Sequence, residues 1–104
     1  MRRGEIWWAE LPAPVGRRPV VLLSRNEAYA VRELVLVAPI TSRIRRIPTE
    51  VARGRADGLP RRCVANLDTL TTIPKRALTQ RLASLTPEKI AAVERALCFA
   101  VGLV

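Results

Sequence analysis

The stretch RPVVLLS, residues 18–24, decides how the rest of the chain is interpreted. Its four consecutive apolar residues predict a strand that is fully buried. We expect Pro19 at the start of this strand, because its missing N–H cannot join a sheet ladder, and proline favours an extended backbone at the residue before it. Arg18 would then lie at the rim of a buried strand, where a fixed guanidinium can bind a phosphate. The alternative is that Arg18 is a solvated surface arginine.

The composition describes a small and strongly basic chain. Its 104 residues are 49% hydrophobic, which predicts one folded domain covering residues 1–104. The formal net charge is +9, and nearly all of the cations are arginine. Such a charge favours nucleic acid, an acidic protein or an anionic membrane surface as a partner. Arginine in particular binds phosphate through two parallel hydrogen bonds and stacks on bases.

The sequence lacks the residues that several kinds of catalysis and metal binding require. There is no histidine, which excludes histidine acid–base pairs, Ser-His or Cys-His nucleophiles and histidine metal ligands. Cys63 and Cys98 have no metal-ligand spacing and lie among apolar residues, so we expect buried free thiols in a reducing cytoplasm. We therefore expect no metal and no cofactor. Glu5 and Glu10 interrupt any signal-peptide pattern, and the apolar tail 96–104 is too short to span a bilayer, so we expect no membrane association.

The remaining pattern predicts a mainly β protein, α+β by content. Strands are expected at residues 4–11, 19–24, 34–38, 49–51, 63–67 and 81–85, with a polar but β-prone segment at 69–73. Short helical turns are expected near 27–29 and 75–78, and Gly54, Gly58 and Pro60 mark a turn. Trp7 and Trp8 point to opposite faces of the first strand. Core or dimer packing is expected for each, and the alternative is that one lies under a base.

The C-terminal segment predicts a packing helix. Thr86-Pro87-Glu88 combines an N-cap, a proline at the first helical position and an acid near the positive end of the dipole. The apolar positions that follow form one stripe, which ends before Gly102: Ile90, Val93, Leu97 and Val101. Several short strands and one terminal helix together suggest a small barrel-like sheet with the helix packed against it.

Polar residues at the ends of the predicted strands form a candidate site. Arg18, Thr41 and Asp68 are its main members, with Ser24 and Asn66 as possible helpers. RNA carries its own nucleophile, the 2′-hydroxyl, so these residues would only need to stabilise negative charge on phosphate oxygens and accept a proton. Thr41 and Asp68 also have adequate structural roles, in hydroxyl–backbone and Asx-turn hydrogen bonds.

In five segments that occur in the same order, the sequence resembles the MazF/PemK toxins of bacterial type II toxin–antitoxin modules. The segments are Arg3-Gly4-Glu5-Ile6-Trp7, Arg18-Pro19-Val20-Val21, Pro39-Ile40-Thr41-Ser42, the run from Cys63 to Ile73, and residues 82–103 with the Leu-Thr-Pro helix start. The resemblance implies an SH3-like β barrel with a C-terminal helix, usually a homodimer. It also implies a metal-independent endoribonuclease that cuts single-stranded RNA, usually mRNA, at short sequences, leaving a 2′,3′-cyclic phosphate and a 5′-hydroxyl.

The resemblance also implies roles for individual residues and for a partner. Arg18 and Thr41 match the family's catalytic arginine and threonine, and Asp68 matches an aspartate that is the proposed base in some members. Asn66 falls where some members have a second active-site arginine. RNA contacts are expected from Arg17, Arg43, Arg45, Arg46 and Asn66. The implied partner is a cognate antitoxin whose acidic, flexible tail covers the RNA groove, for which a +9 protein is a suitable target.

One segment departs from the family pattern. Many members have a longer loop where this chain has residues 12–17, with a glutamate or histidine that assists catalysis, and neither is present here.

Two other functions remain open at this point. A non-catalytic inhibitor on the same barrel, such as a gyrase-poison relative, would not need Arg18 and Thr41 together. A plain RNA-binding barrel should expose several aromatic residues.

Overall fold

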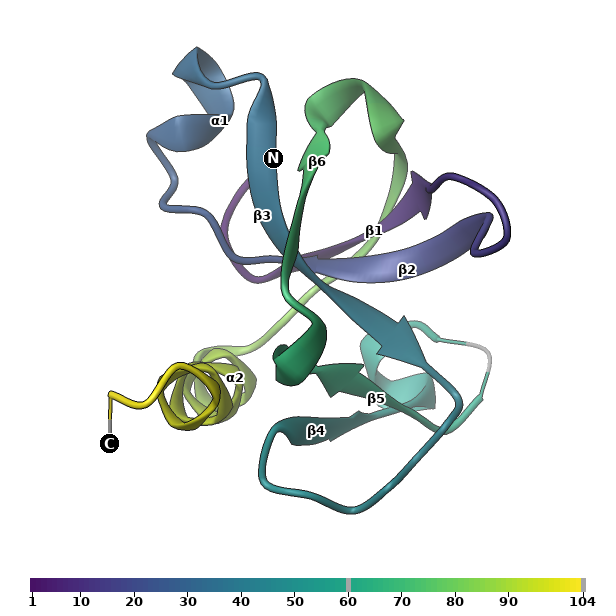
Figure 1. Cartoon of the computed structure of the whole chain (residues 1–104), viewed down its shortest axis with the longest axis vertical. Coiled ribbons are helices and arrows are strands. Elements are labelled where there is room, and N and C mark those ends of the chain that lie inside the picture. The colour runs from purple at the N-terminus through teal and green to yellow at the C-terminus, as the bar shows by residue number, and fades with distance from the viewer. Residues whose placement is uncertain (60, 104) are drawn as a thin grey trace.

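Seven strands and one long helix form the fold in the computed structural model, which describes residues 1–59 and 61–103 (Figure 1). Pro60, part of the predicted turn, and Val104, in the apolar tail, lie outside the described residues. The strands are β1 (Glu5–Glu10), β2 (Arg17–Leu22), β3 (Leu34–Thr41), β4 (Glu50–Arg53), β5 (Cys63–Asn66), β6 (Thr71–Pro74) and β7 (Leu78–Ser84). The helices are α1 (Ala28–Val31) and α2 (Pro87–Ala100), with 3-10 turns η1 (Arg55–Asp57), η2 (Leu67–Thr69) and η3 (Lys75–Ala77).

The strands form one antiparallel sheet that coils into a small barrel-like fold. Their order is β4-β5-β3-β2-β1-β7, and β6 pairs with β3 beside this path. The long strand β3 pairs with β6 along residues 34–37 and with β5 at Ile40 and Thr41. It therefore joins the upper strands of Figure 1 to the lower pair β4–β5. The prediction of a small, mainly β barrel with a C-terminal helix is confirmed, although no pairing between described residues closes the barrel from β4 to β7.

Strand β2 is buried on both faces, as its apolar run predicts. Val20 and Leu22 enter one hydrophobic cluster, which also draws on β1, β3, β6 and β7. Val21 and Leu23 enter a second cluster, built with β3, β5 and α2. Each fully buried valine or leucine contributes about 1.5–3 kcal/mol, so β2 is stabilised from both sides. β2 therefore packs against both cores, and this packing holds the residues at its N-terminal end, Arg17 and Arg18, in a rigid position.

The start of β2 differs from the prediction. The strand begins at Arg17, two residues before the predicted start, and Pro19 is its third residue. The difference arises because β1 pairs with this segment already at Arg17, while β3 joins only at Val20. Pro19 thus lies where β2 is paired on one edge only, a position that tolerates a missing donor.

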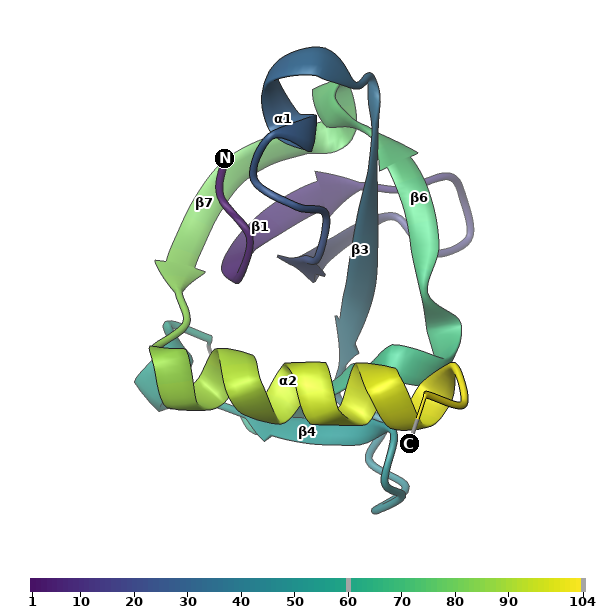
Figure 2. The ribbon, with the colours of Figure 1, turned by 90° about the vertical axis from the view of Figure 1, so that its left-hand side faces the viewer.

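Helix α2 begins and ends as predicted. The Thr86 hydroxyl accepts the backbone N–H of Lys89 at 3.4 Å, and Gly102 follows the helix with a φ of 75°, which favours glycine. α2 lies across β4 and η2 (Figure 2). Its most buried residues are Val93 and Ala96. The predicted apolar stripe is wrong at its last member, Val101, which is exposed. A helix needs about 20 apolar residues to cross a membrane, and no helix among the described residues has that length and apolarity.

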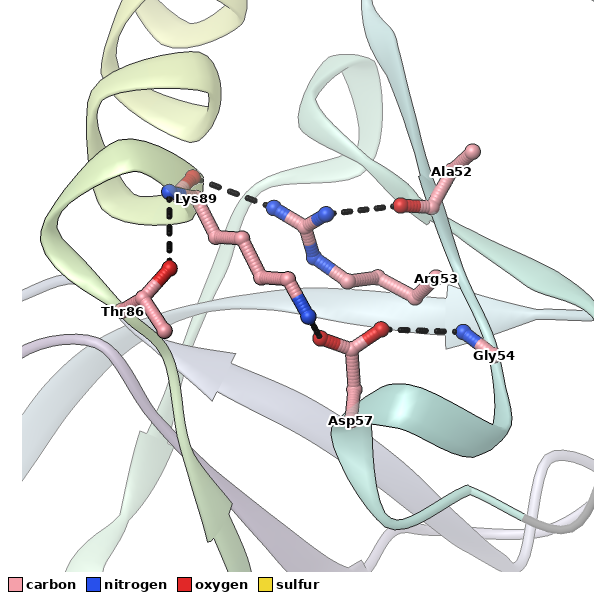
Figure 3. A network of polar contacts seen from close by, with 6 residues as sticks. All are labelled: Ala52, Arg53, Gly54, Asp57, Thr86 and Lys89. Carbon is pink, nitrogen blue, oxygen red and sulfur yellow. Dashed lines mark hydrogen bonds and ion pairs between the residues drawn. The ribbon is translucent and has the colours of Figure 1, made fainter.

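A polar network fastens η1 to the first turn of α2 (Figure 3). The Lys89 ammonium lies 2.7 Å from Oδ1 of Asp57, whose other oxygen accepts the backbone N–H of Gly54 at 3.0 Å. The buried Arg53 donates to the carbonyl oxygens of Ala52, at 2.7 Å, and Lys89, at 3.0 Å. Burial lowers the pKa of the Arg53 guanidinium, and the nearby Asp57 carboxylate partly opposes this. The network fixes the segment that leads toward Leu59.

A second buried carboxylate joins β1 to β7. Glu5 accepts hydrogen bonds from the Trp7 indole at 2.9 Å, the Arg2 backbone at 2.9 Å and the Arg81 guanidinium at 3.3 Å. Burial alone would raise the pKa of Glu5, but these hydrogen bonds outweigh it, and the pKa lies below its usual value. Trp7 also packs against the cluster that contains Val20, so this tryptophan has the core role expected of it.

Candidate functional site

Arg18 and Thr41 lie across from each other where β2 and β3 separate. The pairing of the two strands ends at Val20 and Pro39. Continuing the same register by two residues on each strand brings Arg18 opposite Thr41. Both residues line the same two surface hollows. The structure thus brings together two of the three residues that were predicted to be catalytic, and we call this pair the Arg18–Thr41 ridge.

The first hollow, the Trp8 hollow, has a volume of about 230 Å³ and combines apolar walls with three arginines. Its lining residues are Trp8, Arg17, Arg18, Pro19, Ile40, Thr41, Ser42, Leu59, Arg61 and Cys63. The guanidinium of Arg17 stacks on the Trp8 ring, 4.3 Å from its centroid. The Trp8 hollow therefore offers an aromatic surface and positive charge next to the ridge.

The second hollow, the Asn66 hollow, is richer in hydroxyl and amide groups. Its lining residues are Leu11, Val15, Arg18, Pro39, Thr41, Arg43, Arg45, Asn66, Thr69 and Thr71. Asn66 is buried, and its Oδ1 accepts the backbone N–H of Asp68 at 2.9 Å. This bond fixes the side-chain amide as the cap of η2 and leaves its N–H groups as donors.

The two residues of the ridge have hydrogen-bond donors available. Among residues 1–59 and 61–103, Arg18 takes part in no salt bridge. The Thr41 hydroxyl oxygen accepts the backbone N–H of Arg43 at 3.2 Å, so its own hydrogen can be donated elsewhere. Fixed donors of this kind are suited to negative charge that develops on phosphate oxygens.

The arginines that follow β3 are exposed, and an acid holds their backbone. Oε1 of Glu50 accepts the N–H groups of Arg45, at 2.8 Å, and Arg46, at 2.9 Å. Arg46 has a φ of 58°, in the left-handed region that favours glycine. This turn aims two consecutive N–H groups at one carboxylate oxygen. Glu50 therefore shapes the segment, and the side chains of Arg43 and Arg45 reach the Asn66 hollow while Arg46 does not line it.

Asp68 and Ser24 lie apart from the ridge. Asp68 is exposed at the start of η2, and its Oδ2 accepts the Thr49 hydroxyl at 2.5 Å. It lines neither of the two hollows described above. Ser24 follows the far end of β2, where its hydroxyl accepts the backbone N–H of Leu36 at 2.8 Å. Ser24 thus has a structural role, and the assignment of Asp68 as a base stays a prediction.

Sequence reasoning did not select Arg61 or Leu59 as site residues, and it considered a place under a base for Trp7 or Trp8 only as an alternative. Arg61, Leu59 and Trp8 all line the Trp8 hollow. A signal for Arg61 was present, because two arginines precede a buried strand there, as Arg17 and Arg18 do in β2. No local signal brings Leu59 to the ridge, since this placement depends on the network around η1.

Both cysteines are free thiols, as predicted, but only Cys63 is fully buried and Cys98 is half-buried. Burial, reinforced by the nearby Asp57 carboxylate, raises the pKa of the Cys63 thiol. A thiol of raised pKa is a poor nucleophile. Cys63 therefore contributes packing to the Trp8 hollow, and the ridge remains the chemically distinctive part of the site.

The short loop between β1 and β2 closes tightly beside the ridge. The Leu11 N–H donates to the Gly16 carbonyl at 3.0 Å, and the Val15 N–H donates to the Pro12 carbonyl at 3.1 Å. Gly16 has a φ of 67°, which a side chain would strain. The loop contains no glutamate or histidine. The nearest acid along the chain is Glu10, whose carboxylate lies 3.8 Å from Nε of Arg17.

The fold and the site define a small basic β barrel with an arginine–threonine pair at its rim. A family model described as "PemK-like, MazF-like toxin of type II toxin-antitoxin system" matches residues 2–101. The chain belongs to this family. It is 42% identical over 100 residues to a probable endoribonuclease MazF5 of Mycobacterium tuberculosis (strain ATCC 25618 / H37Rv), covering 95% of this chain and 91% of that protein.

Solved structures agree with this assignment. The Mycobacterium tuberculosis toxin MazF-mt6 superposes with a TM-score of 0.87 at 31% identity, covering 94% of this chain and 96% of that one. An endoribonuclease in complex with its cognate antitoxin from Mycobacterial species superposes with a TM-score of 0.86 at 29% identity, covering 100% and 97%. A MazE–MazF crystal structure (Form-II) from Deinococcus radiodurans gives a TM-score of 0.81 at 26% identity, covering 98% and 95%.

Proposed function

We propose that this chain is the toxin of a type II toxin–antitoxin system and acts as an endoribonuclease on single-stranded RNA, chiefly mRNA, which would inhibit translation and growth. The observation that carries the proposal is the Arg18–Thr41 ridge, which lines two hollows within a surface rich in exposed arginine. A phosphodiester on the ridge would have a nucleotide on each side, one facing each hollow. The chain's relatives, which carry the name endoribonuclease at up to 42% identity, support the same activity.

The proposed reaction is an internal transfer at phosphorus. The 2′-oxygen of the RNA attacks the adjacent phosphorus, its proton passes to a base, and the bond to the 5′-oxygen breaks. The products are a 2′,3′-cyclic phosphate and a 5′-hydroxyl, and no protein nucleophile or metal takes part. Arg18 and Thr41 would stabilise the charge on the non-bridging oxygens, where one well-placed donor contributes about 10²–10³ in rate. Asp68 remains the predicted base, since it lies in η2 between Asn66 and Thr69, which both line the Asn66 hollow.

The surrounding basic residues would hold the RNA on both sides of the ridge. Arg17 lines the Trp8 hollow, and Arg43, Arg45 and Asn66 line the Asn66 hollow. Arg46 is exposed on the same segment as Arg43 and would contact RNA farther from the ridge. The same arginines form a suitable surface for the acidic, flexible tail of a cognate antitoxin, which would compete directly with RNA. The cytoplasm, where mRNA is translated and thiols stay reduced, is the proposed location.

We also propose that two copies of the chain form a homodimer. A groove between β4 and α2 is mostly apolar and is lined by Val51, Ala52, Ala91, Ala92, Ala96 and Phe99, among others. Phe99 is 53% exposed in the single chain. Pairing of two copies through this groove would remove that apolar surface from water. Analytical ultracentrifugation of the purified chain tests it, and a monomer at micromolar concentration would contradict it.

The decisive experiment incubates the purified chain with a long mixed-sequence RNA in the presence of EDTA. We expect cleavage at a limited set of short sequences. The downstream fragments should accept a radioactive phosphate from polynucleotide kinase without prior phosphatase treatment, because they carry a 5′-hydroxyl. Intact RNA would favour a non-catalytic inhibitor or a plain RNA-binding module on the same barrel. Fragments with 5′-phosphate ends, or cleavage that requires a divalent metal, would contradict the proposed reaction.

A further inference from the structure

Trp8 is a large aromatic side chain that the hydrophobic cores do not use. Trp7 packs against the cluster around Val20, but Trp8 belongs to neither of the two core clusters found in the described residues. Its side chain lines the Trp8 hollow and is only half-buried. Large aromatic residues usually contribute core packing, so one that faces a hollow beside a candidate site invites a functional explanation.

The Arg17 side chain that lies over the Trp8 ring is held there only weakly. The Arg17 guanidinium lies 4.3 Å from the ring centroid. The Arg17 side chain is 50% exposed, and its contact with Glu10 is long, at 3.8 Å, with that side chain 58% exposed. Ion pairs exposed to this degree contribute little, and a cation over an exposed ring is held less strongly than a stacked nucleobase. A base could therefore take the place of Arg17 on the indole.

The position of Trp8 connects it to the reacting phosphate. Trp8 pairs with Pro19 in the β1–β2 register, and Arg18 immediately precedes Pro19 in β2. Arg18 and Thr41 line the same hollow as Trp8. The hollow's volume of about 230 Å³ is below the range of roughly 300–1,000 Å³ found for drug-sized ligands. It suits a small flat group such as one base, with Leu59 and Pro19 as apolar walls.

We infer that Trp8 is a base-stacking residue, which binds the nucleobase of one nucleotide adjacent to the scissile phosphate. On binding, the base displaces the Arg17 guanidinium from the ring, and Arg17 moves to a neighbouring phosphate. Stacking on a π-face accepts any base, so this position should contribute affinity and alignment with little choice of sequence. The inference rests on the proposed function for the identity of the ligand, an RNA strand.

The test combines a variant of the protein with a variant of the RNA. A cleavable oligonucleotide is prepared with each base near the cut removed in turn, and kcat/KM is measured for wild type, Trp8→Leu and Trp8→Phe. For the wild type we expect one abasic position next to the cut to lower kcat/KM at least tenfold. Trp8→Leu should show the same loss on intact RNA and no further loss on that abasic RNA, whereas Trp8→Phe should retain most activity. Val31→Ala, which trims another exposed apolar side chain, is the matched control and should behave as wild type.

A binding measurement separates this inference from the proposed cleavage. In a Trp7→Phe background, Trp8 is the only tryptophan, and its fluorescence reports stacking on an RNA made uncleavable by a 2′-deoxy sugar at the cut. Quenching on the intact strand that is lost on the abasic strand supports the stacking role, even if no RNA is ever cut. The inference is overturned if Trp8→Leu and the abasic site lower kcat/KM by factors that multiply, or if Trp8→Leu cuts intact RNA at the wild-type rate. It is also overturned if RNA binding leaves the Trp8 fluorescence unchanged.

Discussion

The Lys89 ammonium lies 2.7 Å from Oδ1 of Asp57, a contact that joins the first turn of α2 to a 3-10 turn 32 residues earlier in the chain. The Asp57 side chain is only 5% exposed, and that of Lys89 is 33% exposed. Through this contact the C-terminal helix holds the segment that ends at Leu59, a wall of the Trp8 hollow. A residue far from the ridge thus helps to shape it.

The first prediction concerns this pair. Lys89→Met leaves the Asp57 carboxylate buried without its cation, and removing one partner of a fully buried pair costs about 3–5 kcal/mol. Because Lys89 is partly exposed, we expect a loss of about 2 kcal/mol in the free energy of unfolding, measured by urea denaturation. The double variant Asp57→Asn/Lys89→Met should be less destabilised than the two single losses add up to. Strictly additive losses would show that the two residues do not interact.

The second prediction concerns the ridge. Arg18→Ala should lower the rate of RNA cleavage by about 10²–10³ with a stability change within about 0.5 kcal/mol, because Arg18 makes no salt bridge among the described residues. Arg18→Lys should also fail, since an ammonium cannot replace the two-pronged guanidinium. Arg25→Ala, an exposed arginine that lines neither hollow, is the control. Wild-type cleavage by Arg18→Ala would remove Arg18 from the reaction.

The third prediction separates chemistry from structure at Asp68. If Asp68 accepts the 2′-hydroxyl proton, Asp68→Asn should lower kcat by about 10²-fold, the lower end for general base catalysis. Thr49→Val removes the hydroxyl that donates to the same carboxylate, so it should affect stability to a similar degree but leave kcat within a few fold. Equal kcat for Asp68→Asn and wild type would exclude the base assignment and leave the ridge assignment untouched.

The fourth prediction uses the lowered pKa of Glu5. A carboxylate whose folded pKa lies below its unfolded value adds stability above the unfolded pKa, and this contribution is lost as pH falls through the folded pKa. At pH 7, Glu5→Gln should therefore lower the free energy of unfolding by about 1.5–3 kcal/mol, the range for hydrogen bonds to a charged group. The difference from wild type should shrink below about pH 4.3. Glu27→Gln, at an exposed position, is the control, and its difference from wild type in the free energy of unfolding should not follow this pattern. If the difference between Glu5→Gln and wild type stayed constant from pH 7 to pH 3, the ionised Glu5 carboxylate would not be its source.

The fifth prediction concerns the basic surface. If about four phosphates are contacted, log affinity for an uncleavable RNA should fall with log salt at a slope near −3. The double variant Arg43→Ala/Arg45→Ala should reduce the slope by roughly 1.4, while Arg76→Ala, exposed on η3, should not change it. Fluorescence anisotropy at several salt concentrations measures the slope. A flat dependence in the wild type would exclude a phosphate-binding groove.

Most of the fold was predictable because the sequence patterns are local. The apolar run of β2 predicted a strand buried on both faces, and the Thr86–Pro87 start predicted α2, although Val101 at its end proved exposed. The early start of β2 was not predictable from Pro19, because it depends on where β1 and β3 begin to pair. Strand pairing is a property of the assembled sheet, and residue preferences alone do not specify it.

The site was predictable only in part, for the same reason. Arg18 and Thr41 could be selected because each stands at the end of a buried strand, and the sheet register brings them opposite each other. Arg61 and Leu59 reach the Trp8 hollow through a turn that a long-range ion pair holds in place. No pattern near those two residues reports such a contact.

Because β2 is clamped between two cores, the position of Arg18 is established when the protein folds and does not depend on its substrate. A phosphate bound to Arg18 is held by a strand that is packed on both faces and cannot easily move. The guanidinium would therefore need little rearrangement as negative charge develops on the phosphate oxygens. Substitutions deep in either core should then alter turnover as well as stability. The RNA sequence that is cut could be changed with less effect on stability by substitutions at residues 12–16 of the β1–β2 loop and in the exposed segment after β3, because these residues belong to neither core.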